Sequence, residues 1–224
     1  MARLTAMSRI RTLLAAVLAV TLMSGCSSEE GSGGPLPDGQ ALLRESATAM
    51  KDVTSVGFVL ATEGTPAGLP VKAMNGELLR NGDAQGDVTA VQAGLTIEAK
   101  FVIVGPDLYF NLMGGYQKTD KSMITSILDP SAILDPERGI ALMLEQATGA
   151  KAEAREDGLV RISASLPGSA VAGLGIKTSQ TLQGQVWINE EDKRLSKVKM
   201  NLDGGSATLS LSDFNADPTI QAPK

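Results

Sequence analysis

Apolar side chains recur at every second position over much of the chain, and this period limits the fold more than any other feature of the sequence. The clearest case is the segment 95–103, where Thr96, Glu98 and Lys100 separate apolar residues on the other face. Because successive side chains of a strand point to opposite faces of a sheet, such alternation predicts a strand with one apolar face. The same pattern predicts strands within 56–60, 108–112, 160–165, 182–188, 198–202 and 207–212.

Segments rich in turn-forming residues separate these predicted strands. They are Asn81-Gly82, Gly105-Pro106, Glu156-Asp157-Gly158, Glu190-Glu191-Asp192 and Asp203-Gly204-Gly205. Short turns between alternating strands indicate an antiparallel meander with one solvated face. We therefore expect an α+β fold in which a single curved antiparallel sheet of about nine to eleven strands carries a few helices on its apolar side.

A helix is predicted just before the first strand. Five apolar residues would share one side of it, starting after Asp38 or Gly39 and ending at Asp52 and Val53. These residues are Ala41, Leu42, Leu43, Ala47 and Met50.

The segment 119–147 interrupts the strand pattern. Asp129-Pro130 and Asp135-Pro136 each place a capping carboxylate before a proline, so two short helices are expected to begin there. Residues 140–144 are all apolar, so that helix must be covered on more than one side or must face something apolar. A further short helix is expected at 169–174.

Periodicity does not decide whether the space between sheet and helices is filled. A packed core and an apolar cavity are both compatible with it. Only seven residues are aromatic, and many strand positions carry Ala, Gly or Val, so few large rings are present to fill a wide sheet. These features favour a cavity.

Several classes of chemistry are excluded by composition. The chain has no His and one Cys, which removes Ser-His-Asp triads, Cys-His dyads, zinc sites with His and haem held by His. Its negative charge and few aromatic residues disfavour nucleic-acid binding. The segment 168–175 lacks the Lys of a phosphate loop, and the acidic run 190–192 lacks an alternating calcium loop. We expect no enzyme activity, cofactor or metal, although distant carboxylate pairs escape sequence analysis.

The first 25 residues are predicted to be a lipoprotein signal peptide. Three Arg precede an apolar run of about a dozen residues, too short for a membrane span of ~20. The run ends in Leu22-Met23-Ser24-Gly25-Cys26, which resembles a bacterial lipobox with Met23 in place of the usual Leu, Val or Ile. We expect Cys26 to be acylated and to hold the chain on the extracytoplasmic face of the cell membrane.

Residues 26–40 are predicted to be the acylated Cys and a flexible linker, and residues 41–224 the folded domain. The linker is rich in Gly, Ser and Pro, with a reach on the order of 20 Å. Removing three Arg and no acid from 20 basic and 25 acidic residues leaves a net charge of −8. Such a chain is repelled by anionic lipid headgroups, so its anchor is the acylated Cys.

Several segments occur in the order found in one lipoprotein family. They are GGPLPD (33–38), IEAKFVI (97–103), DPSAILDP (129–136), GIA (139–141), AKAE (150–153) with Arg155, and VWI (186–188). The chain resembles the LppX/LprAFG lipoproteins of actinobacteria, most of all their LprG branch. It departs from them at Met23 and at Gly114-Gly115-Tyr116, near which relatives often carry a Trp.

This resemblance implies a U-shaped half-barrel whose helices enclose an apolar cavity for acylated lipids, namely glycolipids, phospholipids or triacylglycerols. It implies lipid transport across the cell envelope, with a major-facilitator-type export pump as partner. Val88 corresponds to the family's cavity wall, at the start of a strand. The residues expected to line the cavity are Val56, Phe58, Leu60, Val88, Ile97, Phe101, Ile103, Ile124, Ile127, Ile133, Leu142 and Met143.

Two other functions remain open at this stage. One is a non-catalytic envelope scaffold with a filled core, from which extraction with organic solvent would yield no lipid. The other is a hydrolase of envelope lipid or glycan, which would need a buried carboxyl pair or an activated Ser next to Lys.

Overall fold

The structure is a computed structural model that describes residues 34–224, with the exception of 68, 93, 113 and 123–129. All described residues fall within one compact unit, Gly33–Lys224. Cys26, the predicted signal peptide, Ile124, Ile127 and Asp129 lie outside the described residues.

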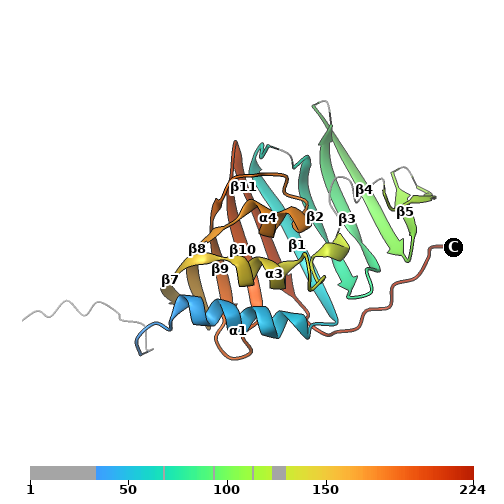
Figure 1. Ribbon diagram of the computed structural model, residues 1–224. Helices are drawn as coiled ribbons and strands as arrows, with labels where there is room; N and C mark the ends of the chain where they lie inside the picture. Colours follow the sequence, from blue (N-terminus) through green and yellow to red (C-terminus); the bar gives the residue numbers. More distant parts are fainter. Residues whose placement is uncertain (1–33, 68, 93, 113, 123–129) are drawn as a thin grey trace, which may run out of the picture. The chain divides into compact units, whose positions relative to one another are not determined.

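The described residues form one antiparallel sheet of eleven strands, which confirms the predicted sheet. Its spatial order is β6-β5-β4-β3-β2-β1-β11-β10-β9-β8-β7, so β6 and β7 are free edges and the sheet is not closed (Figure 1). The strands are β1 (Ser55–Gly64), β2 (Val71–Leu79), β3 (Ala84–Gln92), β4 (Leu95–Val104), β5 (Asp107–Asn111), β6 (Tyr116–Asp120), β7 (Thr148–Glu156), β8 (Leu159–Leu166), β9 (Leu182–Asn189), β10 (Leu195–Leu202) and β11 (Gly205–Ser212).

Helix α1 (Gly39–Lys51) begins where the sequence predicts. The Asp38 carboxylate accepts a hydrogen bond from the Ala41 N–H at 2.7 Å, and Asp52 ends the helix. Leu42, Leu43, Ala47 and Met50 are buried, whereas Ala41 is exposed, so its expected place on the apolar side was wrong.

Helix α3 (Ile140–Gln146) begins later than expected. A 3-10 turn, η1 (Pro130–Ala132), does start at the first proline, but no helix starts at Pro136. The Asp135 carboxylate instead accepts hydrogen bonds from the Glu137 N–H and the Arg138 guanidinium, which holds a turn. Gly139 is the N-cap of the helix. Only glycine fits this position, because a Cβ there would lie 2.2 Å from the Ala132 carbonyl oxygen.

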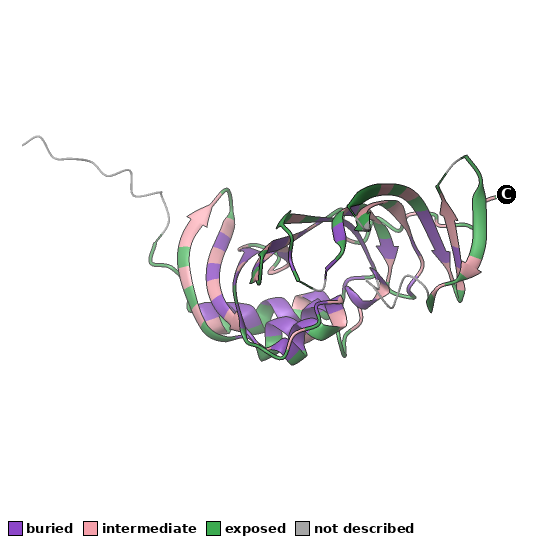
Figure 2. Cartoon of the chain, turned by 90° about the horizontal axis from the view of Figure 1, so that it is seen from above, coloured by how far each residue is buried: buried purple, intermediate pink, exposed green. Residues whose placement is uncertain are grey.

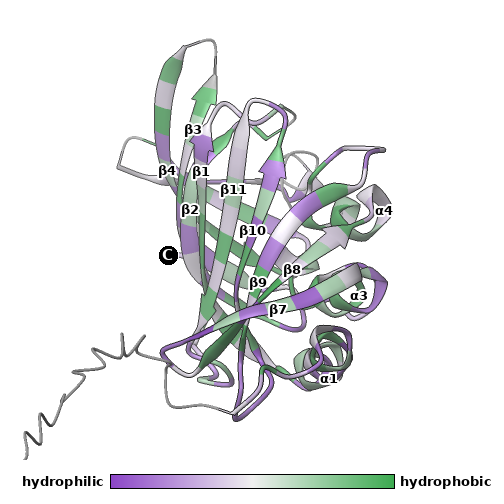
Figure 3. Ribbon diagram, turned by 90° about the vertical axis from the view of Figure 1, so that its left-hand side faces the viewer, coloured by the Kyte–Doolittle hydropathy of each residue, from purple (hydrophilic) through white to green (hydrophobic). Residues whose placement is uncertain are grey.

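Helices α1, α3 and α4 lie on one side of the sheet. Helix α4 (Gly168–Val171) and the turn η2 (Ala172–Leu174) confirm the short helix expected at 169–174. In Figure 3, α1, α3 and α4 lie one above another along the same side of β7–β10. Burial is concentrated there, and exposed positions are more frequent over β3–β6 (Figure 2). We call the side of the sheet that carries these helices the concave face.

The apolar helix α3 is covered by protein. It packs between α1 and α4, and Ile140, Met143 and Leu144 are fully buried. The core between these helices and strands β7–β11 is therefore filled, as in an ordinary packed α+β domain.

Candidate functional site

A small apolar pocket lies between the middle of the sheet and the segments that cross its concave face. Its volume is about 30 Å³. Strands β1, β2, β10 and β11 form its floor, and residues from 130–133, 174–176 and the β1–β2 loop form its walls. The lining residues are Phe58, Leu60, Leu69, Met74, Pro130, Ile133, Leu174, Ile176, Met200, Ala207 and Leu209. We call this set the concave pocket.

Strand register explains why the floor of the concave pocket is apolar. Leu60 is the direct partner of Leu209 on β11 and of Met74 on β2. Direct partners in neighbouring antiparallel strands place their side chains on the same face. Since each strand alternates, the apolar positions of all these strands meet on the concave side.

The same row of partners continues away from the concave pocket. Met74 pairs with Val88 on β3, and Val88 pairs with Ala99 on β4. Beside them, Ala90 pairs with Ile97, and Phe110 lies opposite Phe101. These concave-face residues are half-buried rather than covered. We call them the distal strip: Val88, Ala90, Ile97, Ala99 and Phe110.

Two glycines leave a gap in the neighbouring row. Phe58 pairs with Gly76, Gly76 with Gly86, and Gly86 with Phe101. A Cβ at Gly76 would lie 2.1 Å from the Gln85 carbonyl oxygen, and one at Gly86 would lie 2.0 Å from that of Asn75. Only glycine allows this close approach of β2 and β3, so the concave face has no side chains between the two phenylalanines.

The structure describes ten of the twelve predicted lining residues and divides them into four groups. Phe58, Leu60 and Ile133 line the concave pocket, and Val88 and Ile97 lie in the distal strip. Leu142 is half-buried on α3, and Ile124 and Ile127 lie outside the described residues. Buried in the core without lining the pocket are Val56, Phe101, Ile103 and Met143.

One expectation about this site needs correction. Val88 lies in the middle of β3 and not at its start, because β3 begins at Ala84. The concave pocket has about 30 Å³, whereas ligand pockets usually have at least about 300 Å³, so the lipid cavity expected from the sequence stays a prediction.

Sequence reasoning missed most of the pocket residues. Met200, Ala207 and Leu209 occupy predicted apolar strand positions, but only strand register brings them to the pocket. Leu209 pairs with Leu60, and Ala207 pairs with Met200. Leu69 and Ile176 lie in loops, where no periodicity marks them. One feature visible in the sequence does bear on this face: Gly76 and Gly86, which lie on neighbouring strands, have no side chain.

No titratable side chain lines the concave pocket. Its eleven residues are all apolar, so it offers no acid, base, nucleophile or metal ligand. Among the described residues no group of three or more His, Cys, Asp or Glu side chains is arranged to hold a metal ion.

The described chain has one buried Ser next to a Lys and a carboxylate. The Ser206 hydroxyl and the Lys199 ammonium each donate to the same Glu63 oxygen at 3.0 Å. The hydrogen bonds from Lys199 and Ser206 lower the pKa of Glu63, which makes it a weaker base. This arrangement therefore does not activate the Ser206 hydroxyl as a nucleophile.

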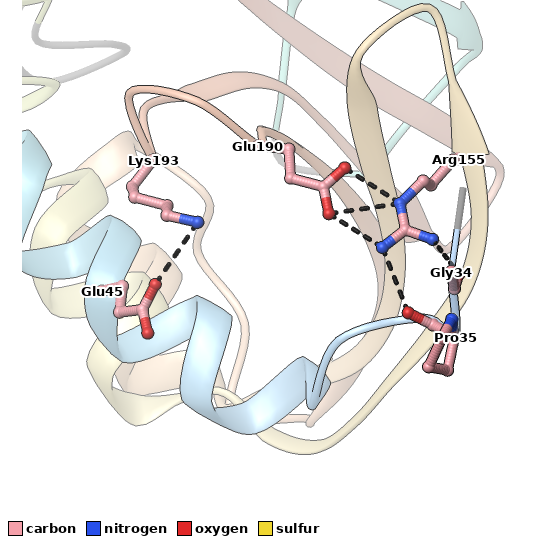
Figure 4. A network of polar contacts seen from close by, with 6 residues as sticks. All are labelled: Gly34, Pro35, Glu45, Arg155, Glu190 and Lys193. Atoms are coloured by element: carbon pink, nitrogen blue, oxygen red, sulfur yellow. Dashed lines mark hydrogen bonds and ion pairs between the residues drawn. The ribbon is translucent and has the colours of Figure 1, made fainter. Parts of the chain in front are cut away.

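A separate polar cluster holds the start of the described chain (Figure 4). Arg155 on β7 forms a two-pronged ion pair with Glu190, with Nε–Oε2 and Nη2–Oε1 distances of 2.9 Å. The same guanidinium donates to the carbonyl oxygens of Gly34 and Pro35. The hydrogen bond from Arg155 lowers the pKa of Glu190 and keeps it ionised. The predicted linker, 26–40, is thus fastened to the domain from residue 34 and enters α1 at Gly39.

Among the described residues, no helix has the length and hydropathy needed to cross a bilayer. The fold and the pocket together define the class of protein: an open antiparallel half-barrel with helices on its concave face and an uncharged apolar pocket.

The sequence profile of the LppX_LprAFG lipoproteins matches residues 38–220, and the chain belongs to this family. It is 35% identical over 216 residues to the lipoarabinomannan carrier protein LprG of Mycolicibacterium smegmatis, covering 92% of each chain. It is 32% identical over 225 residues to the protein of the same name from Mycobacterium tuberculosis H37Rv, covering 96% of this chain and 95% of that one.

Solved structures show the same fold. The crystal structure of LprF from Mycobacterium bovis matches with a TM-score of 0.75 and 23% identity, over 85% of this chain and 99% of that one. The crystal structure of the Mycobacterium tuberculosis lipoprotein LppX matches with a TM-score of 0.63 and 21% identity, over 81% and 97% of the two chains. These comparisons confirm the predicted family and fold.

Proposed function

We propose that this chain is a non-catalytic carrier of acylated lipids that works at the extracytoplasmic face of the cell membrane. The signal peptide exports it, the acylated Cys26 anchors it, and glycolipids, phospholipids or triacylglycerols are its cargo. Relatives named as lipoarabinomannan carriers support this proposal. A major-facilitator-type export pump is the partner that we propose from the family resemblance.

The observation that carries the proposal is the unbroken apolar row on the concave face. Leu60, Met74, Val88 and Ala99 are successive partners across four strands, from the concave pocket to the distal strip. No charged side chain interrupts this row, so an acyl chain laid along it would meet apolar groups over its length. On the other side of Leu60, its partner Leu209 extends the apolar row to β11.

The energetics require such a surface. An acyl chain of ~16 carbons gains about 13 kcal/mol on leaving water at ~0.8 kcal/mol per methylene, so it does not cross an aqueous gap unaided. A lipid already in a bilayer gains almost nothing from a second apolar environment. A carrier therefore needs walls that match, and do not exceed, membrane solvation, which aliphatic side chains provide.

Loading requires the concave pocket to widen. Its walls at Ile133, Leu174 and Ile176 belong to short turns and loops, whereas its floor belongs to the sheet. Segments without regular secondary structure open at lower free energy than core strands. We propose that these walls move away from the floor when lipid enters.

The test uses the chain from Ser27, which has no anchor. Extraction of the purified protein with organic solvent, followed by mass spectrometry, is expected to yield stoichiometric lipid. Val88→Trp would place a large ring between Met74 and Ala99, and we expect it to lose lipid while keeping its fold by circular dichroism. Val59→Trp, at an exposed position on the opposite face, is the matched control and should load normally.

The second candidate function is an envelope scaffold with a filled core. The burial of α3 between α1 and α4 favours it, because that half of the domain has no room for a ligand. An empty extract from a compact and stable protein would support the scaffold and contradict the carrier.

A further inference from the structure

Exposed apolar side chains are concentrated at two neighbouring hairpin turns. The described residues include six large hydrophobic side chains that are exposed, and four of them flank the β3–β4 and β5–β6 turns. Leu95 is 70% exposed, Leu112 49%, Val91 43% and Tyr116 40%. We call these four residues the hairpin tips.

The hairpin tips are apolar on both faces of the sheet. Leu95 shares the concave face with Ile97, whereas Val91 and Tyr116 occupy alternate positions and lie on the other face. Contact with a ligand on the concave face would need apolar residues on that face alone. Apolar side chains on both faces are expected where the turn inserts into an apolar environment that surrounds it.

The two turns contain no charged residue of their own, although Asp87, Glu98 and Lys100 lie beside Leu112 in an open hollow at the β5–β6 turn. No Asp, Glu, Lys or Arg occurs from 88 to 97 or from 108 to 117, in a chain with 45 charged residues. A protein of net negative charge is repelled by anionic headgroups, and uncharged tips lower that repulsion where contact is made. Tyr is also a residue that favours the boundary between headgroups and acyl chains. These properties fit a lipid surface as the partner.

The β3–β4 turn and the start of the described chain lie at opposite ends of the strands. The β5–β6 turn points the same way but ends about five residues along β4 from Leu95, because Asn111 pairs with Lys100. Gly34 and Pro35 are held by Arg155 near the β7–β8 and β9–β10 turns. Figure 1 shows the first described residues and α1 at the bottom and the β3–β4 turn at the top. Strand β4 has ten residues, a span of about 33 Å. The β3–β4 turn therefore lies at the end of the strands opposite the point where the described chain begins.

We propose that the hairpin tips dock into a second lipid surface, opposite the membrane that holds Cys26. The distal strip begins directly behind the tips, since Ile97 follows Leu95 on the same face of β4. Docking would join that surface to the concave pocket by an apolar path, so lipid would pass without crossing water. This inference rests on the proposed carrier function and assigns its docking partner.

The test is vesicle capture by an oriented chain. The chain from Ser27 is attached through an N-terminal oligohistidine tag to a bilayer with nickel-chelating lipid, and fluorescent phosphatidylcholine vesicles are added. We expect the unsubstituted chain to capture vesicles and the double variant Leu95→Asn, Leu112→Asn to capture roughly tenfold fewer. Val59→Asn removes an equally exposed apolar side chain elsewhere and is the matched control, with capture unchanged.

Three results would overturn the proposal: no capture by the unsubstituted chain, equal capture by the double variant, or capture that needs a membrane protein in the added vesicles. Lipid content by mass spectrometry separates this failure from failure of the carrier function. If the chain contains lipid but captures no vesicle, only the docking proposal is wrong. If the chain contains no lipid, the proposed carrier function is wrong as well.

Discussion

Gly76 and Gly86 face each other across β2 and β3, and each leaves room for the backbone next to its partner. A Cβ at Gly76 would lie 2.1 Å from the Gln85 carbonyl oxygen, a distance that no packed structure tolerates. The pair therefore sets how closely the two strands approach where the concave face passes from the concave pocket to the distal strip.

Gly76→Ala is expected to destabilise the domain by about 1–3 kcal/mol, because the strands must shift to admit the methyl group. Urea unfolding followed by circular dichroism measures this. Gly115→Ala is the control, since nothing lies within 4 Å of its Cβ. Equal stability of the two variants would show that the strand approach at Gly76 is not tight.

Arg155→Met is expected to release residues 34–38 from the domain. The substitution removes the donors to the Gly34 and Pro35 carbonyls and leaves Glu190 without its ion pair. Amide hydrogen exchange at 36–40 should become faster, while exchange in the strands stays the same. Lys100→Met breaks an ion pair with Asp87 on the far side of the sheet and should leave 36–40 unchanged. Unchanged exchange in Arg155→Met would contradict this role.

Acid is expected to open the same cluster. The hydrogen bond from Arg155 lowers the pKa of Glu190, so the pair is intact above the ordinary carboxyl pKa of about 4.3. Its contribution to stability is lost only as pH falls through the lower pKa of the folded state. The NMR signal of the Arg155 Nε–H should therefore be constant from neutral pH to about pH 5 and shift in more acidic solution. Glu190→Gln should abolish that shift, and persistence of the shift in this variant would assign it to another group.

Ser46→Ala is expected to stabilise the domain by about 1 kcal/mol or more, because a buried hydroxyl without a partner costs desolvation. Ser46 lies on the buried face of α1, and its oxygen has no hydrogen-bond partner among the residues that the structure describes. Thermal unfolding measures the gain. Thr48→Ala, at an exposed position of the same helix, removes a hydroxyl that donates to the Arg44 carbonyl oxygen. It should therefore gain no more than the helix-propensity difference of up to about 0.7 kcal/mol. A loss of stability in Ser46→Ala would mean that the hydroxyl has a partner in solution.

Local patterns in the sequence predicted the elements that depend on neighbouring residues. Alternation in 95–103 identified β4, and Asp38 identified the start of α1, because side-chain direction and capping act over a few residues. The same reasoning failed at Pro136, where Arg138 and the Glu137 N–H occupy the Asp135 carboxylate. A capping residue and a proline start a helix only when the carboxylate is not used in another turn.

The candidate site was less accessible from the sequence. Phe58, Leu60 and Ile133 were identified because they are apolar on predicted elements, but Phe101 and Met143 have the same character and lie in the filled core. Leu69 and Ile176 lie in loops that fold back over the sheet, and no local pattern predicts where a loop returns.

Residue order alone was sufficient for the antiparallel sheet, the turns between its strands and the absence of His chemistry, since these follow from side-chain type and short-range geometry. Only the folded chain decided that α3 is enclosed between α1 and α4, that Leu60, Met74, Val88 and Ala99 form one row, and that Arg155 reaches back to Gly34. These are contacts between segments far apart in the sequence. Their partners are chosen by strand register and by competition for the same buried surface, which involve the whole chain at once.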